Sequence, residues 1–138
     1  MKLTKTNHVK IYGHRGARGD LPENTLGSFK YLFENKISAY ETDILLTKDL
    51  IPVVYHDFRL NPALTKDHQG NWIEDNDIKI FNLAYEELSK FKIGEIDKKS
   101  KYGRRFDNQK SLSGIKIPKL SDLLELTSNY ISDALIIN

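Results

Sequence analysis

The sequence predicts an α/β fold that forms the front portion of a larger βα architecture. Short β-rich segments alternate with helical stripes of apolar residues along the chain. The length of 138 residues fits one domain, since domains most often have roughly 100–150 residues. Residues 134–137 have the composition of a buried parallel strand, which belongs between neighbouring strands, yet only Asn138 follows them. We therefore expect a fold that is cut short or is completed by something else.

The first strand and helix are predicted from local signals. Residues 9–13 are β-rich and end in glycine, which predicts a strand that runs into a turn, and glycines and a proline make 14–24 a loop. A helix is expected from Thr25, with Asn24 or Thr25 as its cap and a stop at Asn35. Its apolar residues recur at helical spacing: Leu26, Phe29, Leu32 and Phe33.

Two further strands are expected over 38–47 and 51–55, joined by a tight turn at Lys48 and Asp49. Proline is tolerated at the mouth of a strand, so Pro52 agrees with the second of them. In parallel α/β folds the carboxyl ends of the strands form the edge where ligands bind. We therefore expect residues that follow each of these strands to share one edge.

The remainder reads as a long polar excursion followed by a return to regular structure. Residues 58–82 are rich in Asn, Asp, Lys and Gln, and a brief helix is expected over 84–91, with Asn82 as a candidate cap. Residues 94–114 are expected to form a loop. A helix over 120–126, capped near Ser121, then precedes the strand at 134–137.

Composition and charge exclude several classes of function. A net charge of +2, from 21 basic and 19 acidic residues, gives neither half of the chain the one-sided basic field that nucleic-acid binding needs. The basic and aromatic run over 98–106 is flanked by Asp97 and Asp107, and we interpret it as a solvated loop. The absence of cysteine excludes disulfides, thiolate metal sites and thiol nucleophiles.

No sequence feature indicates a membrane or secretory protein. No apolar run approaches the roughly 20 residues of a membrane span. The N-terminus has positive charge but no apolar segment behind it, so it does not form a signal peptide. We expect a cytoplasmic protein, with a periplasmic location left open if the true start lies upstream.

Glu41 and Asp43 are candidate metal ligands. Residues i and i+2 of a strand point to the same face, so two carboxylates project together among isoleucine and leucine. A hard divalent cation, Mg²⁺ or Ca²⁺, would offset the repulsion between them. The alternative is that this face of the strand is simply solvated.

Two histidines add candidate proton carriers at the same edge. His14 follows the first predicted strand and His56 the third, and imidazole suits proton transfer near neutral pH. Each could equally be an ordinary loop histidine. Arg15, next to Gly16, offers a planar fork for phosphate, or a plain loop salt bridge.

The helix start at Pro22-Glu23-Asn24-Thr25 also has two interpretations. It places an acid near the positive end of the helix dipole, which any good helix start does. Because Glu23 and Asn24 lie beside the His14 loop, they could instead support the site.

Together these motifs resemble the glycerophosphodiester phosphodiesterase family. The family pattern is a strand ending in His-Arg-Gly, a Pro-Glu-Asn-Thr helix start, a Glu-x-Asp strand and a strand ending in His-Asp, and residues 12–57 match it in order and spacing. Residues 117–124 are similar to its later Pro-x-Leu-x-x-x-Leu helix. The resemblance implies that 9–138 is a partial domain, the front portion of a TIM (β/α)8 barrel cut short, with a long insertion after the third strand over 57–116.

The resemblance also implies an activity and a set of roles. The expected reaction is metal-dependent hydrolysis of glycerophosphodiesters to sn-glycerol 3-phosphate and an alcohol, with Mg²⁺ or Ca²⁺ as cofactor. His14 and His56 would be the general acid/base pair, Arg15 would contact the phosphate, and Glu41 and Asp43 would bind the cation. The supporting residues around them would be Glu23, Asn24 and Asp57.

The alternative is a truncated, non-catalytic remnant with at most weak cation or phosphate binding. The family continues into an Ile-Glu-x-Lys segment that carries a further metal ligand and a positive charge, and neither is present before Asn138. A second chain or a missing C-terminal half would complete the barrel. For the 138-residue chain alone we expect little activity and marginal stability.

Overall fold

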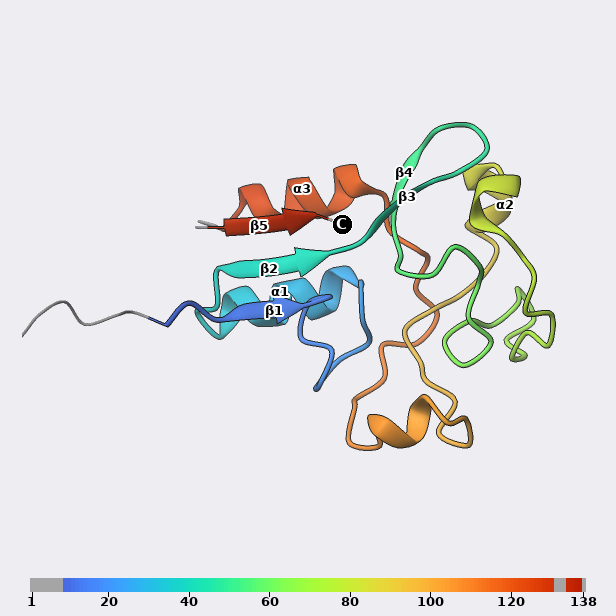
Figure 1. The fold of residues 1–138 in the computed structure, drawn as a ribbon, viewed down its shortest axis with the longest axis horizontal. Helices are drawn as coiled ribbons and strands as arrows, with labels where there is room; N and C mark the ends of the chain where they lie inside the picture. The colour runs from blue at the N-terminus through green and yellow to red at the C-terminus, as the bar shows by residue number, and fades with distance from the viewer. Residues whose placement is uncertain (1–8, 131–133, 138) are drawn as a thin grey trace, which may run out of the picture.

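The computed structural model describes residues 9–130 and 134–137 (Figure 1). The N-terminal residues 1–8, to which the prediction on signal peptides applies, lie outside this range. The helices and strands are β1 (Tyr12–His14), α1 (Leu26–Glu34), β2 (Ala39–Thr42), β3 (Ile44–Leu46), β4 (Pro52–Val54), α2 (Tyr85–Leu88), α3 (Leu120–Ser128) and β5 (Ala134–Ile137), with short 3₁₀ turns η1 (Ile80–Asn82) and η2 (Gly103–Arg105).

The centre of the fold is a three-stranded parallel sheet in the order β1-β2-β5. The helices α1 and α3 pack together beside this sheet (Figure 1). Their shared core surrounds Tyr40 of β2, whose ring centroid lies 5.0 Å from that of Phe29 and 5.7 Å from that of Phe33. The Tyr40 hydroxyl lies 2.7 Å from the Thr127 hydroxyl of α3. This tyrosine therefore links both helices to the central strand.

The strand predicted over 38–47 is wrong as a single strand, because it divides at Asp43 into β2 and β3. The strand predicted over 51–55 is also not a third parallel strand: β4 pairs antiparallel with β3 in a separate two-stranded sheet. The cause is the tight turn at 47–51, closed by a hydrogen bond of 2.9 Å from Leu50 N to Thr47 O. Parallel neighbours need a crossover of a dozen or more residues, whereas a tight turn produces antiparallel strands.

In the sheet, the position beside β2 is therefore occupied by β5 and not by the 51–55 strand. The chain leaves the parallel sheet at Asp43, earlier than the expected departure at residue 57. The boundaries 57–116 of the predicted insertion stay a prediction.

The polar excursion, residues 58–114, shares a hydrophobic core with β4, Tyr55 and the segment before α3. Eight buried side chains form it: Val53, Tyr55, Leu60, Ile73, Ile80, Leu88, Ile93 and Ile117. Regular structure within it is limited to η1, α2 and η2, so the helix predicted over 84–91 is shorter than expected, and Asn82 ends η1 rather than capping that helix. This segment lies to the right and below in Figure 1, beyond the carboxyl ends of the parallel strands.

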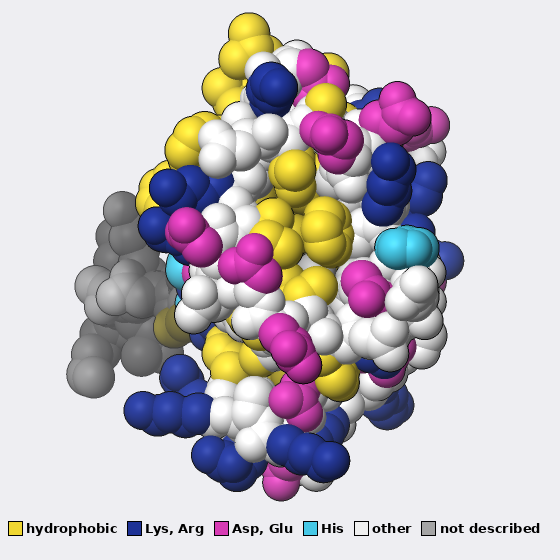
Figure 2. Space-filling model, turned by 90° about the vertical axis from the view of Figure 1, so that its right-hand side faces the viewer, with side chains coloured by type: hydrophobic (Ala, Val, Ile, Leu, Met, Phe, Trp, Pro, Cys, Tyr) yellow, Lys and Arg dark blue, Asp and Glu magenta, His cyan; other side chains and the backbone are white. Residues whose placement is uncertain are grey.

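The face on that side is not fully polar. Hydrophobic side chains form a band among charged ones (Figure 2). A groove of about 270 Å³ lies between η1 and the β3–β4 hairpin and is lined by apolar residues from both. Phe58 and Phe81, which also line it, are largely exposed.

The N-termini of α1 and α3 are capped in different ways. Thr25 caps α1: its hydroxyl accepts a hydrogen bond from Ser28 N at 3.2 Å and donates one to Pro22 O at 2.8 Å. At α3 the predicted cap near Ser121 is wrong. The helix starts after Lys119, whose backbone N–H donates to the Asp122 carboxylate at 2.9 Å.

We predict that Thr25→Ala lowers the free energy of unfolding by about 1–2 kcal/mol, because the first turn of α1 loses its acceptor. Ser121→Ala is the matched control, since Ser121 is exposed and caps nothing, and should change stability by less than about 0.5 kcal/mol. Urea unfolding of the two variants measures both values. Equal effects would contradict the assignment of the caps.

Candidate active site

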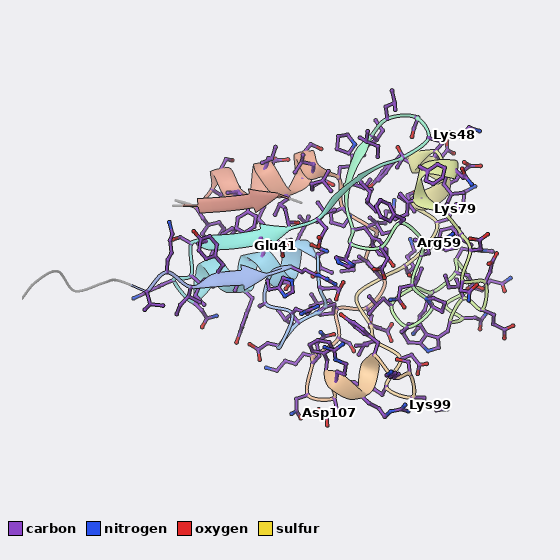
Figure 3. All side chains as sticks on the ribbon, in the orientation of Figure 1. Glu41, Lys48, Arg59, Lys79, Lys99 and Asp107 are labelled. Carbon is purple, nitrogen blue, oxygen red and sulfur yellow. The ribbon has the colours of Figure 1, made fainter. Side chains whose placement is uncertain are left out.

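The site begins where β1 and β2 end side by side. In the parallel register His14 is paired with Glu41, and Figure 3 marks Glu41 on β2. The backbone N–H of Arg15 is 3.0 Å both from the Glu41 carbonyl oxygen and from its side-chain Oε2. Arg15 (φ 57°) and Gly16 (φ 82°) both have left-handed backbone, which turns the chain sharply away from the sheet. The sheet register thus brings His14, Arg15 and Glu41 together.

The Arg15 side chain is mostly buried among carboxylates. Its Nη1 donates to Glu23 Oε1 at 3.0 Å, and its Nε lies 3.5 Å from Asp43 Oδ2. Within the described residues that Nε is a buried donor without a hydrogen bond. Because Arg15 contacts Glu41 through its backbone and Asp43 through its side chain, both predicted metal ligands lie against one residue.

Asn24 supports this cluster instead of capping the helix. Its side chain is buried, donates to Asp43 Oδ2 at 3.1 Å and accepts from the Thr42 hydroxyl at 3.1 Å. Its backbone is also left-handed, with φ 54°. Asn tolerates this conformation better than most residues. The start of α1 is thereby tied to the end of β2.

His56 arrives at the same edge by a route that differs from the predicted one. The hairpin reverses the chain, and the Tyr55 backbone N–H donates to the Asp43 carbonyl oxygen at 3.0 Å. His56 Nδ1 lies 2.6 Å from Asp57 Oδ1, and Asp57 Oδ2 accepts from Asn61 Nδ2 at 3.0 Å. His56 is therefore placed by an antiparallel return, not by the end of a third parallel strand. His14 and His56 line different surface hollows, so their action on one bond stays a prediction.

Tyr55 joins the hairpin to the excursion. It is buried, its hydroxyl accepts from Asn61 N at 2.9 Å, and it shares a hydrogen bond of 3.2 Å with the Thr65 hydroxyl. Burial raises the pKa of Tyr55 to about 12. The hydroxyl therefore stays protonated and holds the Asn61 backbone beside Asp57.

The interpretation of 98–106 as a solvated loop holds for its basic residues, which are all exposed, but not for its aromatic residues, which pack inward. The Tyr102 hydroxyl donates to the Glu23 carboxylate, and burial together with this bond raises the pKa of Tyr102, so it remains a donor. Lys98 Nζ donates to the carbonyl oxygens of Phe106 and Asp107 at 2.9 and 2.5 Å, which folds the run onto itself. The signal that could have found this packing is the presence of Tyr102 and Phe106 among the basic residues.

Only part of a cation site is found. Glu41 and Asp43 provide carboxylate oxygens, which suit Mg²⁺ or Ca²⁺. Among residues 9–130, however, no group of three or more His, Asp or Glu side chains is arranged to hold an ion. Glu41 and Asp43 therefore supply only two of the ligands that a cation needs.

Comparison with known proteins identifies the family. The model of the glycerophosphoryl diester phosphodiesterase family matches residues 14–135. The chain belongs to this family. A phosphodiesterase from Caldanaerobacter subterraneus subsp. tengcongensis, named a glycerophosphodiester phosphodiesterase, is 34% identical over 116 residues, which are 84% of this chain and 39% of the relative.

Solved structures support the α/β barrel fold class of the family. A Silicibacter pomeroyi structure, assigned as a glycerophosphoryl diester phosphodiesterase, matches with a TM-score of 0.90 and 38% identity over 94% of this chain and 44% of that one. An Oleispira antarctica phosphodiesterase in complex with sn-glycerol-3-phosphate matches with a TM-score of 0.66 and 26% identity, over the same 94% and 44%. The chain thus spans less than half the length of these family members.

Within the described part of the chain, no helix is both long and apolar enough to cross a bilayer.

We predict that Asn24→Gly lowers the free energy of unfolding by about 2–3 kcal/mol, because Asp43 and Thr42 lose a buried partner. Asn24→Ala should cost about 1 kcal/mol more, since alanine adds the strain of the left-handed backbone that glycine avoids. Urea unfolding of both variants separates the two contributions. An alanine variant as stable as the glycine variant would argue against the strained backbone.

We predict that Tyr55→Phe lowers stability at pH 7 by about 1–2 kcal/mol, because the Asn61 N–H loses its acceptor. The folded pKa of about 12 exceeds the ordinary value of 10.0, so this tyrosine stabilises the fold below pH 10 and loses that effect as pH rises toward 12. The gap between wild type and variant should therefore shrink above pH 10, as measured by urea unfolding at a series of pH values. Tyr31→Phe, at an exposed position, should show no such convergence.

Proposed function

We propose that this site hydrolyses glycerophosphodiesters to sn-glycerol 3-phosphate and an alcohol. The observation that carries the proposal is the meeting of three chain segments at one sheet edge: His14 lies beside Glu41, and the Tyr55–Asp43 hydrogen bond brings His56 to the end of β2. Family membership supports the reaction class. The product bound to the Oleispira antarctica phosphodiesterase is consistent with the same substrate chemistry.

In this proposal His14 and His56 act as the acid/base pair. Their exposed side chains, 56% and 38% accessible, can reach a substrate without rearrangement of the core. Each ring has its second nitrogen occupied by a polar partner, Arg18 for His14 and Asp57 for His56. Such partners hold an imidazole in one orientation, which positioned proton transfer requires.

The proposed cofactor is Mg²⁺ or Ca²⁺, bound in part by Glu41 and Asp43. When bound, such an ion neutralises charge on the phosphoryl oxygens. Arg15 places these two carboxylates, and its guanidinium group is proposed to contact the phosphate. Glu23 and Asn24 hold Arg15 and Asp43, and Asp57 orients His56.

A second candidate is a non-catalytic chain that binds cation or phosphate weakly. The observation that favours it is the missing third ligand: among residues 9–130 no three His, Asp or Glu side chains are arranged to hold an ion.

We predict activity against glycerophosphocholine, with Mg²⁺ or Ca²⁺, for a chimera in which residues 9–137 replace the aligned part of the Silicibacter pomeroyi protein. His14→Ala and His56→Ala in this chimera should each lower kcat by about 10²–10⁴-fold with unchanged thermal unfolding. His68→Ala, at an exposed histidine away from the site, is the control and should retain full turnover.

The 138-residue chain assayed in parallel tests the alternative. An inactive chain with an active chimera supports a competent but incomplete site. A folded chimera without turnover would overturn the proposed function and favour the weak-binding alternative.

A further inference from the structure

Arg18 belongs to none of the four motifs, yet it is the partner of His14 Nδ1. It lies four positions after His14 in the loop behind β1, and its side chain is only 20% exposed. Its Nη2 lies 2.9 Å from His14 Nδ1, and its Nη1 lies 3.9 Å from Glu23 Oε2. The Arg18 guanidinium therefore lies between His14, a proposed proton carrier, and the Glu23 carboxylate.

We propose that Arg18 is a positioning residue that fixes the orientation and the tautomer of His14. A guanidinium group has only donors and stays protonated in proteins, so in this hydrogen bond Nδ1 of His14 must be the acceptor. The ring proton is therefore on Nε2, which lies 3.7 Å from Glu41 Oε2 on the side of the proposed cation. This inference rests on the proposed role of His14 in the reaction.

His56 has the opposite arrangement. Its Nδ1 lies 2.6 Å from a carboxylate oxygen of Asp57, and a carboxylate accepts, so here Nδ1 carries the proton, and in the neutral ring Nε2 is the acceptor. His14 thus presents a donor and His56 an acceptor. These partners give the two histidines different roles in the proposed reaction: Nε2 of His56 accepts a proton from the attacking water, and Nε2–H of His14 donates a hydrogen bond to the departing alcohol oxygen. That oxygen takes up a proton as His56 gives up its own, so both histidines return to their starting state.

The polar excursion holds Arg18 in place. The Phe106 ring lies 5.2 Å from the Arg18 guanidinium carbon, within the range of a cation–π contact. The Arg18 carbonyl oxygen accepts from Gln109 Nε2 at 2.8 Å, and Lys110 N donates to the Asp20 carbonyl oxygen at 2.9 Å. A positioning group must itself be held by packing and hydrogen bonds, and the 106–110 segment supplies both.

The test uses Arg18→Met, which keeps an unbranched apolar side chain and removes the guanidinium with its donors. Arg105→Met is the matched control, because Arg105 lies 5.9 Å from the same ring and, within the described residues, makes no hydrogen bond to His14. Long-range ¹H–¹⁵N NMR on the cation-free 138-residue chain reports which nitrogen of His14 carries the proton. His14→Gln assigns the signal.

In wild type and in Arg105→Met we expect the His14 proton on Nε2. In Arg18→Met we expect a mixture of tautomers, and in the active chimera a loss in kcat of about 10–100-fold with little change in KM, as misplacement of a reacting group produces. Arg18→Lys restores one donor and should recover the wild-type tautomer and part of the turnover. If Arg18→Met fails to fold, the tautomer of His14 in Arg18→Lys is the measurement that tests the inference.

A His14 proton on Nδ1 in wild type, or an unchanged tautomer in Arg18→Met, would overturn the inference. The NMR result is independent of turnover. If the tautomers behave as expected while the chimera hydrolyses nothing, the positioning by Arg18 stands and the proposed function fails.

Discussion

The pairing of β1 with β2 is the constraint on which the rest of the site depends. Because the register sets His14 opposite Glu41, the next residue, Arg15, meets both the backbone and the side chain of Glu41 with one N–H group. A register shift of one residue would turn every side chain of the strand to the other face. The glutamate, and with it the carboxylate cluster, would then leave the site.

The charge of Arg15 is what makes the cluster tolerable. Glu23 and Asp43 are both mostly buried, and burying like charges is costly unless they are paired and hydrogen-bonded. The guanidinium provides the countercharge, and Asn24 and Tyr102 provide further donors to the same carboxylates. The cluster is therefore a partly neutralised, hydrogen-bonded structural unit as well as a proposed binding site. This dual role explains why its members come from a strand end, a helix start and a distant loop.

The polar excursion completes the site from outside the sheet. The core that it shares with Val53 and Tyr55 fixes the β3–β4 hairpin and hence His56. Its 98–110 segment contacts Glu23 through Tyr102 and Arg18 through Phe106. Polar sequence thus conceals ordered structure here, because the charged ends of lysine and arginine bond to backbone carbonyl oxygens. Lys98, with its bonds to the carbonyl oxygens of Phe106 and Asp107, is the clearest case.

The sequence by itself determined the elements whose signals are local and the residues whose chemistry is unusual. The helix at Leu26–Glu34 follows from its apolar stripe and Thr25, and the family follows from four short motifs in order. Only the tertiary structure decided that β4 runs antiparallel to β3, that Asn24 supports Asp43, and that Tyr102 and Arg18 belong to the site. The physical reason is that strand partners, and contacts between residues 79 positions apart such as Glu23 and Tyr102, depend on how separate segments pack. Periodicity and spacing report only what neighbouring residues do along one segment.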